Sequence, residues 1–299
     1  MKIKKIAFFL PSLEGGGAEK MILKIANNFS KNGFYVDLLL VNNKGPYKNS
    51  ISKKLNVVDF KKMRVLFSFF AFIKYVNKQN LDIIISSMTH LNILTLISKI
   101  FFYKKDIKIV ISERVIFDDY KFIKIKKKDR FIKFFAKYFY KYADHTIAVS
   151  NGVKESLLVN TNLDEKNVSV IYNPSYIKIT KKKLLKTKTP KLISTLRPNK
   201  ILLSIGRLSE QKNFKDLFLA FSSLKNKINC KLIILGEGED RKKLEVLIDQ
   251  MNLTQDIFLI GFKSDIVPWL VNSDLFVLSS IYEGFANVMV EAMSLGLQV

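Results

Sequence analysis

Two glutamates near the end of the chain have the type and spacing of groups that bind hydroxyls. Glu283 lies in a turn after the apolar run 275–278, and Glu291 lies in an apolar helical pattern with seven residues between the two carboxylates. The run is typical of a buried strand. A carboxylate just past the carboxyl end of a strand, beside a helix N-terminus, lies where open α/β sheets bind ligands. Glu283 is therefore a candidate for binding a sugar, and Glu291 for binding a ribose.

Two cations occupy a similar position in an earlier part of the chain. Arg207 and Lys212 flank a turn that begins with Gly206, after the strand-like run 201–205. Fixed cations at the carboxyl end of a strand suit the two phosphates of a diphosphate. Combined with the two carboxylates, they predict a site for a nucleotide-diphosphate sugar that uses no metal ion.

A run of three glycines near the N-terminus offers another anion site. Gly15, Gly16 and Gly17 separate the strand-like run 2–10 from a helical pattern that starts at Ala18. Glycines let the backbone approach a ligand, and N–H groups at a helix N-terminus bind anions. The run is not GxGxxG, and no Lys-Ser/Thr pair follows as a P-loop requires. A tight turn without a ligand explains the run equally well.

Strand-like and helix-like runs alternate along the chain in two series. This alternation predicts parallel sheets with helices on both faces, so the expected fold class is α/β, doubly wound. The strand-like runs of the first series are 2–10, 35–41, 82–86, 108–112, 146–150 and 168–174. Those of the second series are 201–205, 231–235, 257–260 and 275–278.

The composition between the two series changes to Lys, Thr, Ser and Pro without apolar periodicity. Such a stretch is typical of an interdomain linker. We therefore predict a Rossmann-like first domain at 1–177, a linker at 178–200 and a second Rossmann-like domain at 201–299. Ligands are expected to bind across a cleft between the two domains.

Bulk composition excludes several classes of protein. The 299 residues suit two domains, and 48% of them are hydrophobic, which is ample for packed cores. A single cysteine, Cys230, rules out an internal disulfide framework, and no cluster has the spacing of a zinc site. No apolar run approaches the roughly 18 residues that span a bilayer, and the first apolar run is too short for a signal peptide. We expect a cytoplasmic protein.

Positive charge is concentrated in the first two thirds of the chain. Residues 1–200 carry 40 Lys and Arg against 14 Asp and Glu, or +26, whereas residues 201–299 carry 10 against 12, or −2, which together make +24. This asymmetry predicts different tasks for the two domains. A nucleic-acid-binding protein is the weakest interpretation, because most bases are lysine and no recognised nucleic-acid-binding motif appears.

The strongest basic segment, 121–143, combines lysines with aromatic residues. Its helical pattern at 129–142 repeats aromatic residues at i, i+3 and i+4, namely Phe131, Phe134, Phe135, Tyr138, Phe139 and Tyr142. We expect these rings to pack on the domain's own sheet, with Lys133, Lys137 and Lys141 facing water.

Membrane contact is expected for the basic block as a whole. Four lysines precede the helix in a predicted loop, namely Lys124, Lys126, Lys127 and Lys128. Each base near an anionic surface contributes on the order of 1 kcal/mol. An anionic membrane surface is therefore an expected partner.

Six short motifs occur in order along the chain. They lie at 15–19 (GGGAE), 148–152 (AVSNG), 170–174 (VIYNP), 204–213 (SIGRLSEQKN), 234–238 (ILGEG) and 283–291 (E-x7-E). With these motifs the chain resembles the retaining glycosyltransferases of family 4 over essentially its whole length. The resemblance implies the GT-B fold, in which two Rossmann-like domains face each other across a cleft.

The resemblance implies a role for each matching residue. Arg207 and Lys212 resemble the pair that grips the donor diphosphate and stabilises the leaving group, whereas Glu283 faces the donor sugar and Glu291 binds the ribose. The other residues that match the donor-side motifs are Gly16, Gly17, Gly206, Glu237, Phe285, Ala286 and Asn287. The family needs no divalent metal, and no DxD motif stands at a strand end, so no cofactor is expected.

The acceptor side is less specific. His90 lies just past the strand-like run 82–86, in the region that faces the acceptor in the family. It is expected to contact the acceptor or the sugar, although an incidental loop histidine fits as well, and His145 is expected to be structural. The glycine loop and the basic first domain resemble members that extend lipid-linked surface glycans such as O-antigen or capsule.

This subtype sets the expected substrates and location. The donor is expected to be a UDP-linked hexose or N-acetylhexosamine, and the acceptor a polyprenyl-diphosphate-linked saccharide. The enzyme would lie peripherally on the inner face of the cell membrane. The family's second domain normally continues beyond the position of Val299, so we expect a C-terminally truncated chain. An inactive remnant or a glycan-binding pseudoenzyme of the same family is the alternative to an active transferase.

Overall fold

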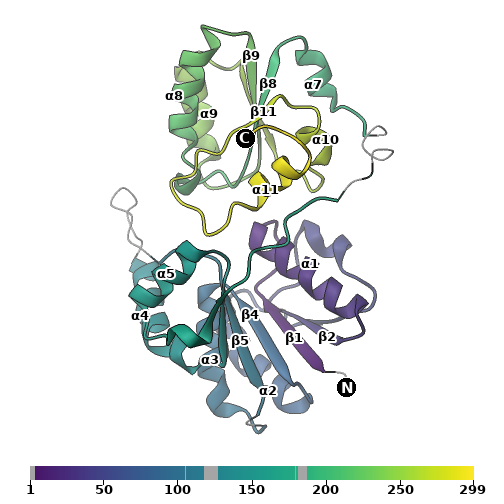
Figure 1. The fold of residues 1–299 in the computed structure, drawn as a ribbon, viewed down its shortest axis with the longest axis vertical. Coiled ribbons are helices and arrows are strands. Elements are labelled where there is room, and N and C mark those ends of the chain that lie inside the picture. The colour runs from purple at the N-terminus through teal and green to yellow at the C-terminus, as the bar shows by residue number, and fades with distance from the viewer. Residues whose placement is uncertain (1–3, 105, 118–126, 179, 181–186) are drawn as a thin grey trace. The chain divides into compact units, whose positions relative to one another are not determined.

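The computed structural model describes residues 4–104, 106–117, 127–178, 180 and 187–299. The chain divides into two compact units, Met1–Asn173 (unit 1) and Pro174–Val299 (unit 2). Each unit is a parallel sheet covered by helices (Figure 1). The predicted α/β class is therefore confirmed. Within the part of the chain that the structure describes, no helix is both long and apolar enough to cross a membrane.

Unit 1 contains a seven-stranded sheet in the order β3-β2-β1-β4-β5-β6-β7, and every neighbouring pair is parallel. The described strands are β1 (Lys5–Leu10), β2 (Tyr35–Leu40), β3 (Asn56–Asp59), β4 (Ile83–Ser87), β5 (Lys108–Glu113), β6 (His145–Ala148) and β7 (Val168–Val170). Central strand β1 is buried from Ile6 to Leu10. A continuous apolar run is expected there because both faces of a parallel sheet are covered.

The helices of unit 1 follow the predicted alternation. They are α1 (Gly17–Lys31), α2 (Phe69–Lys78), α3 (Thr89–Ser98), α4 (Lys127–Phe139) and α5 (Asn151–Asn160), with 3-10 turns η1 (Pro46–Ser50), η2 (Val65–Ser68), η3 (Lys99–Phe101), η4 (Tyr140–Tyr142) and η5 (Glu165–Asn167). Strand β3 was not predicted. Its two valines are only half-buried between polar residues, because β3 is a short edge strand held by pairing with β2.

Unit 2 contains a four-stranded parallel sheet in the order β10-β9-β8-β11. Its described elements are β8 (Lys200–Ile205), β9 (Cys230–Leu235), β10 (Ile257–Gly261), β11 (Leu275–Phe276), η6 (Glu210–Lys212), α7 (Lys191–Leu196), α8 (Phe214–Lys225), α9 (Arg241–Gln250), α10 (Val267–Leu270) and α11 (Asn287–Ser294). Two apolar clusters lie on opposite faces of the sheet. One includes Phe218 and Ile248 of α8 and α9, and the other includes Trp269 and Ala292 of α10 and α11.

The predicted linker contains a helix. Helix α7 lies within the range 178–200, and its Ile193 is fully buried in the cluster with Leu203 and Trp269. Composition alone missed this helix because it contributes one short apolar turn, too little for a periodic signal. The lysine run 181–186 of the predicted linker lies outside the described residues.

The orientation predicted for the aromatics of α4 was wrong. Phe131, Phe134, Tyr138 and Tyr142 are 44–66% exposed, whereas Ala136 and Tyr140 are the fully buried residues of this segment. At 3.6 residues per turn the six aromatic positions span an arc of only about 140°, and fully buried Ala136 lies outside this arc, so a different face of the helix is buried. Lys133 also differs from the prediction, because its ammonium donates to the carbonyl of Phe117 at 2.5 Å. Residues 121–126 of the basic block lie outside the described residues.

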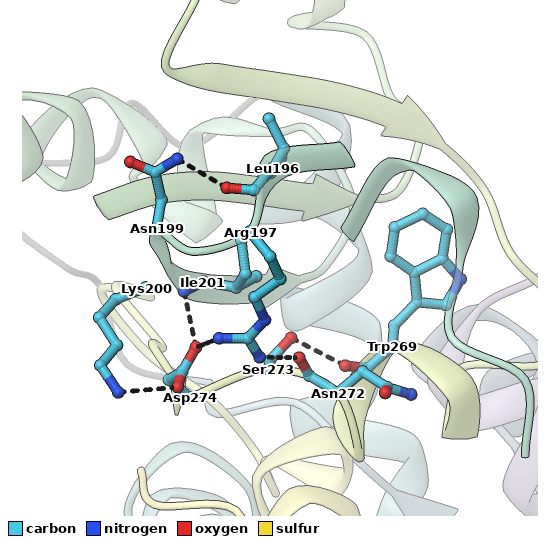
Figure 2. A network of polar contacts seen from close by, with 9 residues as sticks. All are labelled: Leu196, Arg197, Asn199, Lys200, Ile201, Trp269, Asn272, Ser273 and Asp274. Atoms are coloured by element: carbon cyan, nitrogen blue, oxygen red, sulfur yellow. Dashed lines mark hydrogen bonds and ion pairs between the residues drawn. The ribbon is translucent and has the colours of Figure 1, made fainter. Parts of the chain in front are cut away.

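In each of the two sheets, an aspartate just before a strand connects the amino ends of neighbouring strands. In unit 2, Asp274 precedes β11 and accepts from the Ile201 N–H at 2.8 Å, Arg197 at 2.9 Å and Lys200 at 3.2 Å (Figure 2). Asp144 repeats this pattern in unit 1, where it accepts from the Ile109 N–H and two lysines. These carboxylates connect the start of one strand to the start of its neighbour.

Candidate active site

The turns that follow β8 and β9 lie against each other at the carboxyl edge of the sheet in unit 2. The Gly206 N–H donates to Leu235 O at 3.0 Å, and the Leu208 N–H donates to Glu237 O at 3.0 Å. Gly236 comes so close that a Cβ there would lie 1.8 Å from Gly206 O. Only glycine fits such an approach. The sequence motifs around Gly206 and Glu237 therefore form one surface.

Lys212 lies over this surface and pairs with Glu283. It ends η6, and the methylenes of its side chain lie 3.1–3.4 Å from the position of a Cβ on Gly206. Its ammonium forms an ion pair with Glu283 Oε1, and the two side chains are 17% and 22% exposed. Since the predicted cation and carboxylate are 71 residues apart in sequence, this contact is tertiary.

Several hydrogen bonds attach the loop that carries Glu283 to η6. Ser279 Oγ donates to Lys212 O at 2.8 Å, and the Ile281 N–H donates to Gln211 O at 2.9 Å. Gln211 returns a hydrogen bond from its amide to Tyr282 O at 2.9 Å. Ser280 Oγ donates to Glu283 Oε1 at 2.7 Å. These bonds fix the positions of Lys212 and Glu283, and the roles of Ser279 and Ser280 were not predicted.

The other two charged candidates of these turns differ in their surroundings. Arg207 directly follows Gly206 and is exposed. Glu237 pairs with Arg241 of α9 at 2.7 Å, and Arg241 also holds Glu245 at 2.8 Å. The carboxylate of Glu237 therefore stabilises the first turn of α9 through its ion pair with Arg241, while its backbone carbonyl joins the two turns.

The residues around Glu291 belong to the start of α11. Phe285 and Ala286 precede the helix, and Asn287 begins it. The side chain of Asn287 accepts a hydrogen bond from Ser175 Oγ at 2.6 Å, so it anchors the first residues of unit 2. Glu291 lies one turn further along α11 and is 5% exposed. The proposed ribose carboxylate is thus a buried group of this helix.

The glycine loop of unit 1 leads directly into α1. Gly16 is the residue before the helix, and Gly17 is its first residue. A Cβ on Gly16 would lie 1.9 Å from a carboxylate oxygen of Glu19, which is itself buried. The carboxylate of Glu19, which the sequence prediction did not use, therefore lies directly against the Gly16 backbone.

The two histidines lie at opposite ends of the sheet in unit 1. His90 is the second residue of α3, after the carboxyl end of β4, and it is half-buried. His145 begins β6 at the amino end, where its Nε2 lies 2.9 Å from Ser169 Oγ. The role of His90 on the acceptor side stays a prediction, whereas the contact of His145 with β7 agrees with a structural role.

Sequence reasoning missed a buried polar cluster next to His90. Glu113, fully buried at the end of β5, accepts from Tyr140 OH at 2.6 Å, Thr89 Oγ1 at 3.1 Å and the Arg114 N–H at 2.9 Å. Burial raises the pKa of Glu113, and these hydrogen bonds oppose the rise. A carboxylate at the carboxyl end of a strand was the signal used for Glu283, and it would have identified Glu113 too.

Arg114 extends this cluster to the end of unit 1. Its Nε donates to Ser87 Oγ at 2.9 Å and its Nη1 to Asn173 Oδ1 at 2.7 Å. Burial lowers the pKa of Arg114 to about 10, although the charges of Glu113 and Glu19 raise it. The guanidinium remains protonated at neutral pH. It joins the end of β4 to the last residue of unit 1.

Metal ligands are not clustered in the part of the chain that the structure describes. No group of three or more His, Cys, Asp or Glu side chains there could hold an ion. Among the charged residues predicted for the donor site, the structure brings the cation Lys212 into contact with the carboxylate Glu283.

Two protein-family models match the chain, one in each unit. Residues 15–175, more than half of the chain, match the model described as Glycosyltransferase Family 4, and residues 187–299 match Glycosyl transferases group 1. The predicted family is confirmed by these matches.

The curated relatives include bacterial glycosyltransferases. One, from Campylobacter jejuni, is named N-acetylgalactosamine-N,N'-diacetylbacillosaminyl-diphospho-undecaprenol 4-alpha-N-acetylgalactosaminyltransferase. It is 27% identical over 300 residues, which cover 98% of this chain and 79% of the relative. The lipopolysaccharide 1,6-galactosyltransferase of Salmonella typhimurium is 30% identical over 166 residues, or 52% of this chain and 42% of the relative.

A solved structure with the same fold is that of Anabaena HepE in complex with UDP-glucose. It superposes with a TM-score of 0.79 at 21% identity and covers 98% of this chain and 79% of that one. The likeness shows that the chain has the GT-B fold, as the sequence motifs predicted.

Proposed function

Because the chain belongs to glycosyltransferase family 4 and is a glycosyltransferase, we propose that it moves a hexose or N-acetylhexosamine from a UDP-sugar to a lipid-linked saccharide. The transfer is proposed to retain the anomeric configuration and to serve the synthesis of a surface glycan. The observation that carries this proposal is the contact of Lys212 with Glu283 over the Gly206 turn. It brings together the cation proposed to bind phosphate and the carboxylate proposed to bind a sugar hydroxyl.

Lys212 has the capacity for both partners. An ammonium has three N–H donors, and the contact with Glu283 uses one of them. Two donors remain for the oxygens of a diphosphate, and exposed Arg207 lies on the same turn. A cation held in position stabilises the charge that develops on a leaving diphosphate. We assign this task to Lys212 and Arg207 rather than to a metal, so activity should survive EDTA.

Glu283 is the proposed contact to the donor sugar. Its Oε1 accepts from both Lys212 and Ser280, which limits the rotation of the carboxylate. A fixed carboxylate can accept hydrogen bonds from sugar hydroxyls and orient the anomeric carbon. The acceptor hydroxyl would attack on the face from which the diphosphate leaves. Glu291 would bind the ribose, and Gly16, Gly17 and residues 285–287 would contribute backbone groups.

A thermal-shift and turnover screen of nucleotide sugars tests the donor. UDP-sugars are expected to raise the melting temperature and to be consumed when a polyprenyl-diphosphate saccharide is present. Glu283→Ala and Lys212→Ala should each lower the rate of transfer by about 10²–10³-fold while circular dichroism stays unchanged. Full turnover in either variant would reject the site, and the absence of any response to all nucleotide sugars would favour a remnant or pseudoenzyme.

Peripheral attachment to the inner membrane surface is the second part of the proposal. The outer face of α4 exposes Phe131, Phe134 and Tyr138 beside the bases Arg130 and Lys137 of the same helix and Lys141 of η4. Exposed aromatics beside cations suit the interface of an anionic bilayer. The chain should bind vesicles containing phosphatidylglycerol, and added salt should weaken the binding. Phe131→Ser with Phe134→Ser should reduce it, while Leu219→Ser, at an exposed site in unit 2, should not.

A further inference from the structure

Two consecutive residues of unit 1, Glu113 and Arg114, hold both sides of a strained turn. Met88 lies between β4 and α3 with φ 83° and ψ 133°. Glycine adopts this φ freely, whereas any other residue is strained there. Such strain persists only when the surrounding structure over-determines it, and it collects at functional sites.

The hydrogen bonds on either side of Met88 account for its conformation. Ser87, the preceding residue, accepts from Arg114 Nε at 2.9 Å. Thr89, the following residue, donates to Glu113 Oε2 at 3.1 Å. Since the end of β5 carries both partners, the turn is fixed to a buried, rigid strand. His90 comes directly after Thr89, so its backbone is set by the same contacts.

Glu113 is itself held by several donors. Tyr140 OH and the Asn92 amide reach Oε2 at 2.6 and 3.5 Å, and the N–H groups of Arg114 and Val115 reach Oε1 at 2.9 and 3.3 Å. Burial and the charge of Glu113 raise the pKa of Tyr140 well above its usual value, so the phenol remains a donor at neutral pH. The carboxylate is therefore a fixed anchor rather than a surface group.

We propose that Glu113 and Arg114 are positioning residues, which hold the turn 87–89 and thereby fix the imidazole of His90 for the acceptor side of the reaction. The structural part of this proposal concerns unit 1 alone. Only the use of His90 in transfer rests on the proposed function. Core packing by itself predicts a loss of stability on mutation but no specific response of His90.

A matched pair of variants isolates the Glu113–Thr89 bond. Thr89→Val keeps the shape of the side chain and removes the hydroxyl, whereas Thr89→Ser keeps the hydroxyl. The chain has two histidines, which makes ring-proton NMR simple, and His90→Asn assigns the signals. Thr89→Val and Glu113→Gln should shift or broaden the His90 resonance and leave that of His145 in place. Thr89→Ser should keep the wild-type spectrum.

Kinetics then test whether the position of His90 matters for transfer. Thr89→Val should lower kcat about tenfold, because a small misplacement of a reacting group is costly. The KM for the UDP-sugar should not change, since Thr89 is not among the residues proposed to contact the donor. In a His90→Asn background, Thr89→Val should cause no further loss, because both changes act through the same group.

Separate outcomes overturn the two proposals. An unchanged His90 resonance in folded Thr89→Val and Glu113→Gln would overturn the positioning role, whether or not the chain transfers a sugar. A loss of kcat in Thr89→Ser equal to that in Thr89→Val would also overturn it. By contrast, a shifted His90 signal without turnover of any nucleotide sugar would leave the positioning role intact and reject the proposed transfer.

Discussion

The two ends of the sheets use the same kinds of charged residues in different ways. At the amino ends, Asp274 and Asp256 each contact two basic side chains, and the partners of Asp274 are 42% and 65% exposed. At the carboxyl ends, Glu113 is fully buried and Glu283 has a single ion-pair partner among the described residues, the largely buried Lys212. The aspartates at the amino ends thus each have two basic partners, whereas at the carboxyl ends the hydrogen-bonded carboxylate Glu113 and the Lys212–Glu283 pair hold turns.

This difference teaches how to distinguish structural from functional charges in a parallel sheet. A carboxylate before a strand accepts the neighbouring strand's N–H, as Asp274 does with Ile201, so its geometry follows from strand pairing. A carboxylate after a strand meets loops, whose conformation is not set by pairing. Glu113 and Glu283 therefore determine where loop residues lie, and ligands bind at that edge.

The largest effect is expected at the carboxyl edge of unit 2. Lys212→Ala should lower kcat by about 10²–10³-fold, because a preorganised charge opposite the leaving group is lost. Lys243→Ala, which removes an exposed ion pair with Asp240 in the same unit, should leave kcat unchanged. Steady-state kinetics with the UDP-sugar found in the screen measures both. Equal effects of the two substitutions would contradict the role proposed for Lys212.

The next effect concerns the carboxyl edge of unit 1. Arg114→Lys should destabilise the chain by about 2 kcal/mol, since an ammonium cannot replace a planar guanidinium that donates to Ser87 and Asn173 at the same time. Arg130→Lys on exposed α4 should change stability by less than about 0.5 kcal/mol. Urea unfolding compares them. A tolerated Arg114→Lys would mean that these bonds do not hold the turn.

A smaller effect is expected for the amino edge of unit 2. Asp274→Asn should cost about 1 kcal/mol, because its ion pairs are partly exposed and the amide oxygen can still accept from the Ile201 N–H. Its kcat should equal that of the unaltered chain. The measurements are urea unfolding and turnover. A marked loss of kcat without a loss of stability would assign this edge a functional role.

The smallest effect is a dependence of stability on acid pH. Burial alone would raise the pKa of Asp274, but the Ile201 N–H, Lys200 and Arg197 lower it below the usual value, and Asp144 and Asp256 are lowered likewise. A carboxylate whose pKa is lowered in the folded state stabilises that state at pH values above its unfolded pKa of about 4. This stabilisation is lost as the pH falls through the folded pKa.

Substituting these three aspartates with asparagine should therefore reduce the loss of unfolding free energy below about pH 4, by a few tenths of a kcal/mol per site. Unfolding midpoints between pH 5 and pH 3 measure the change. Lys243→Ala serves as the control, because it keeps all three carboxylates. If stability fell as steeply with pH in the triple variant as in the unaltered chain, the loss of stability in acid would come from other carboxylates. Buried Glu113 would not be among them, because its pKa is raised in the folded state.

Much of the fold could be predicted because the relevant signals are local. Ten strand-like segments were predicted from apolar runs with β-branched residues. Nine of them match described strands of the two sheets, and the last, 275–278, contains the shorter strand β11. Edge strand β3 and helix α7 were missed, since their few apolar residues become buried only through contacts with β2 and with Trp269. Which rings of α4 face outward also depends on the position of the sheet.

The sequence alone determined the family and the alternation of strands and helices, and it supplied the residue types of the proposed donor site, because motifs and periodicity are properties of neighbouring positions. Only the tertiary structure decided that Lys212 contacts Glu283 across 71 residues, that Glu237 braces α9, and that Glu113 and Arg114 hold the turn before His90. Such contacts form between loops that follow neighbouring strands. Which strands are neighbours is decided by the packing of the whole sheet rather than by any local sequence pattern.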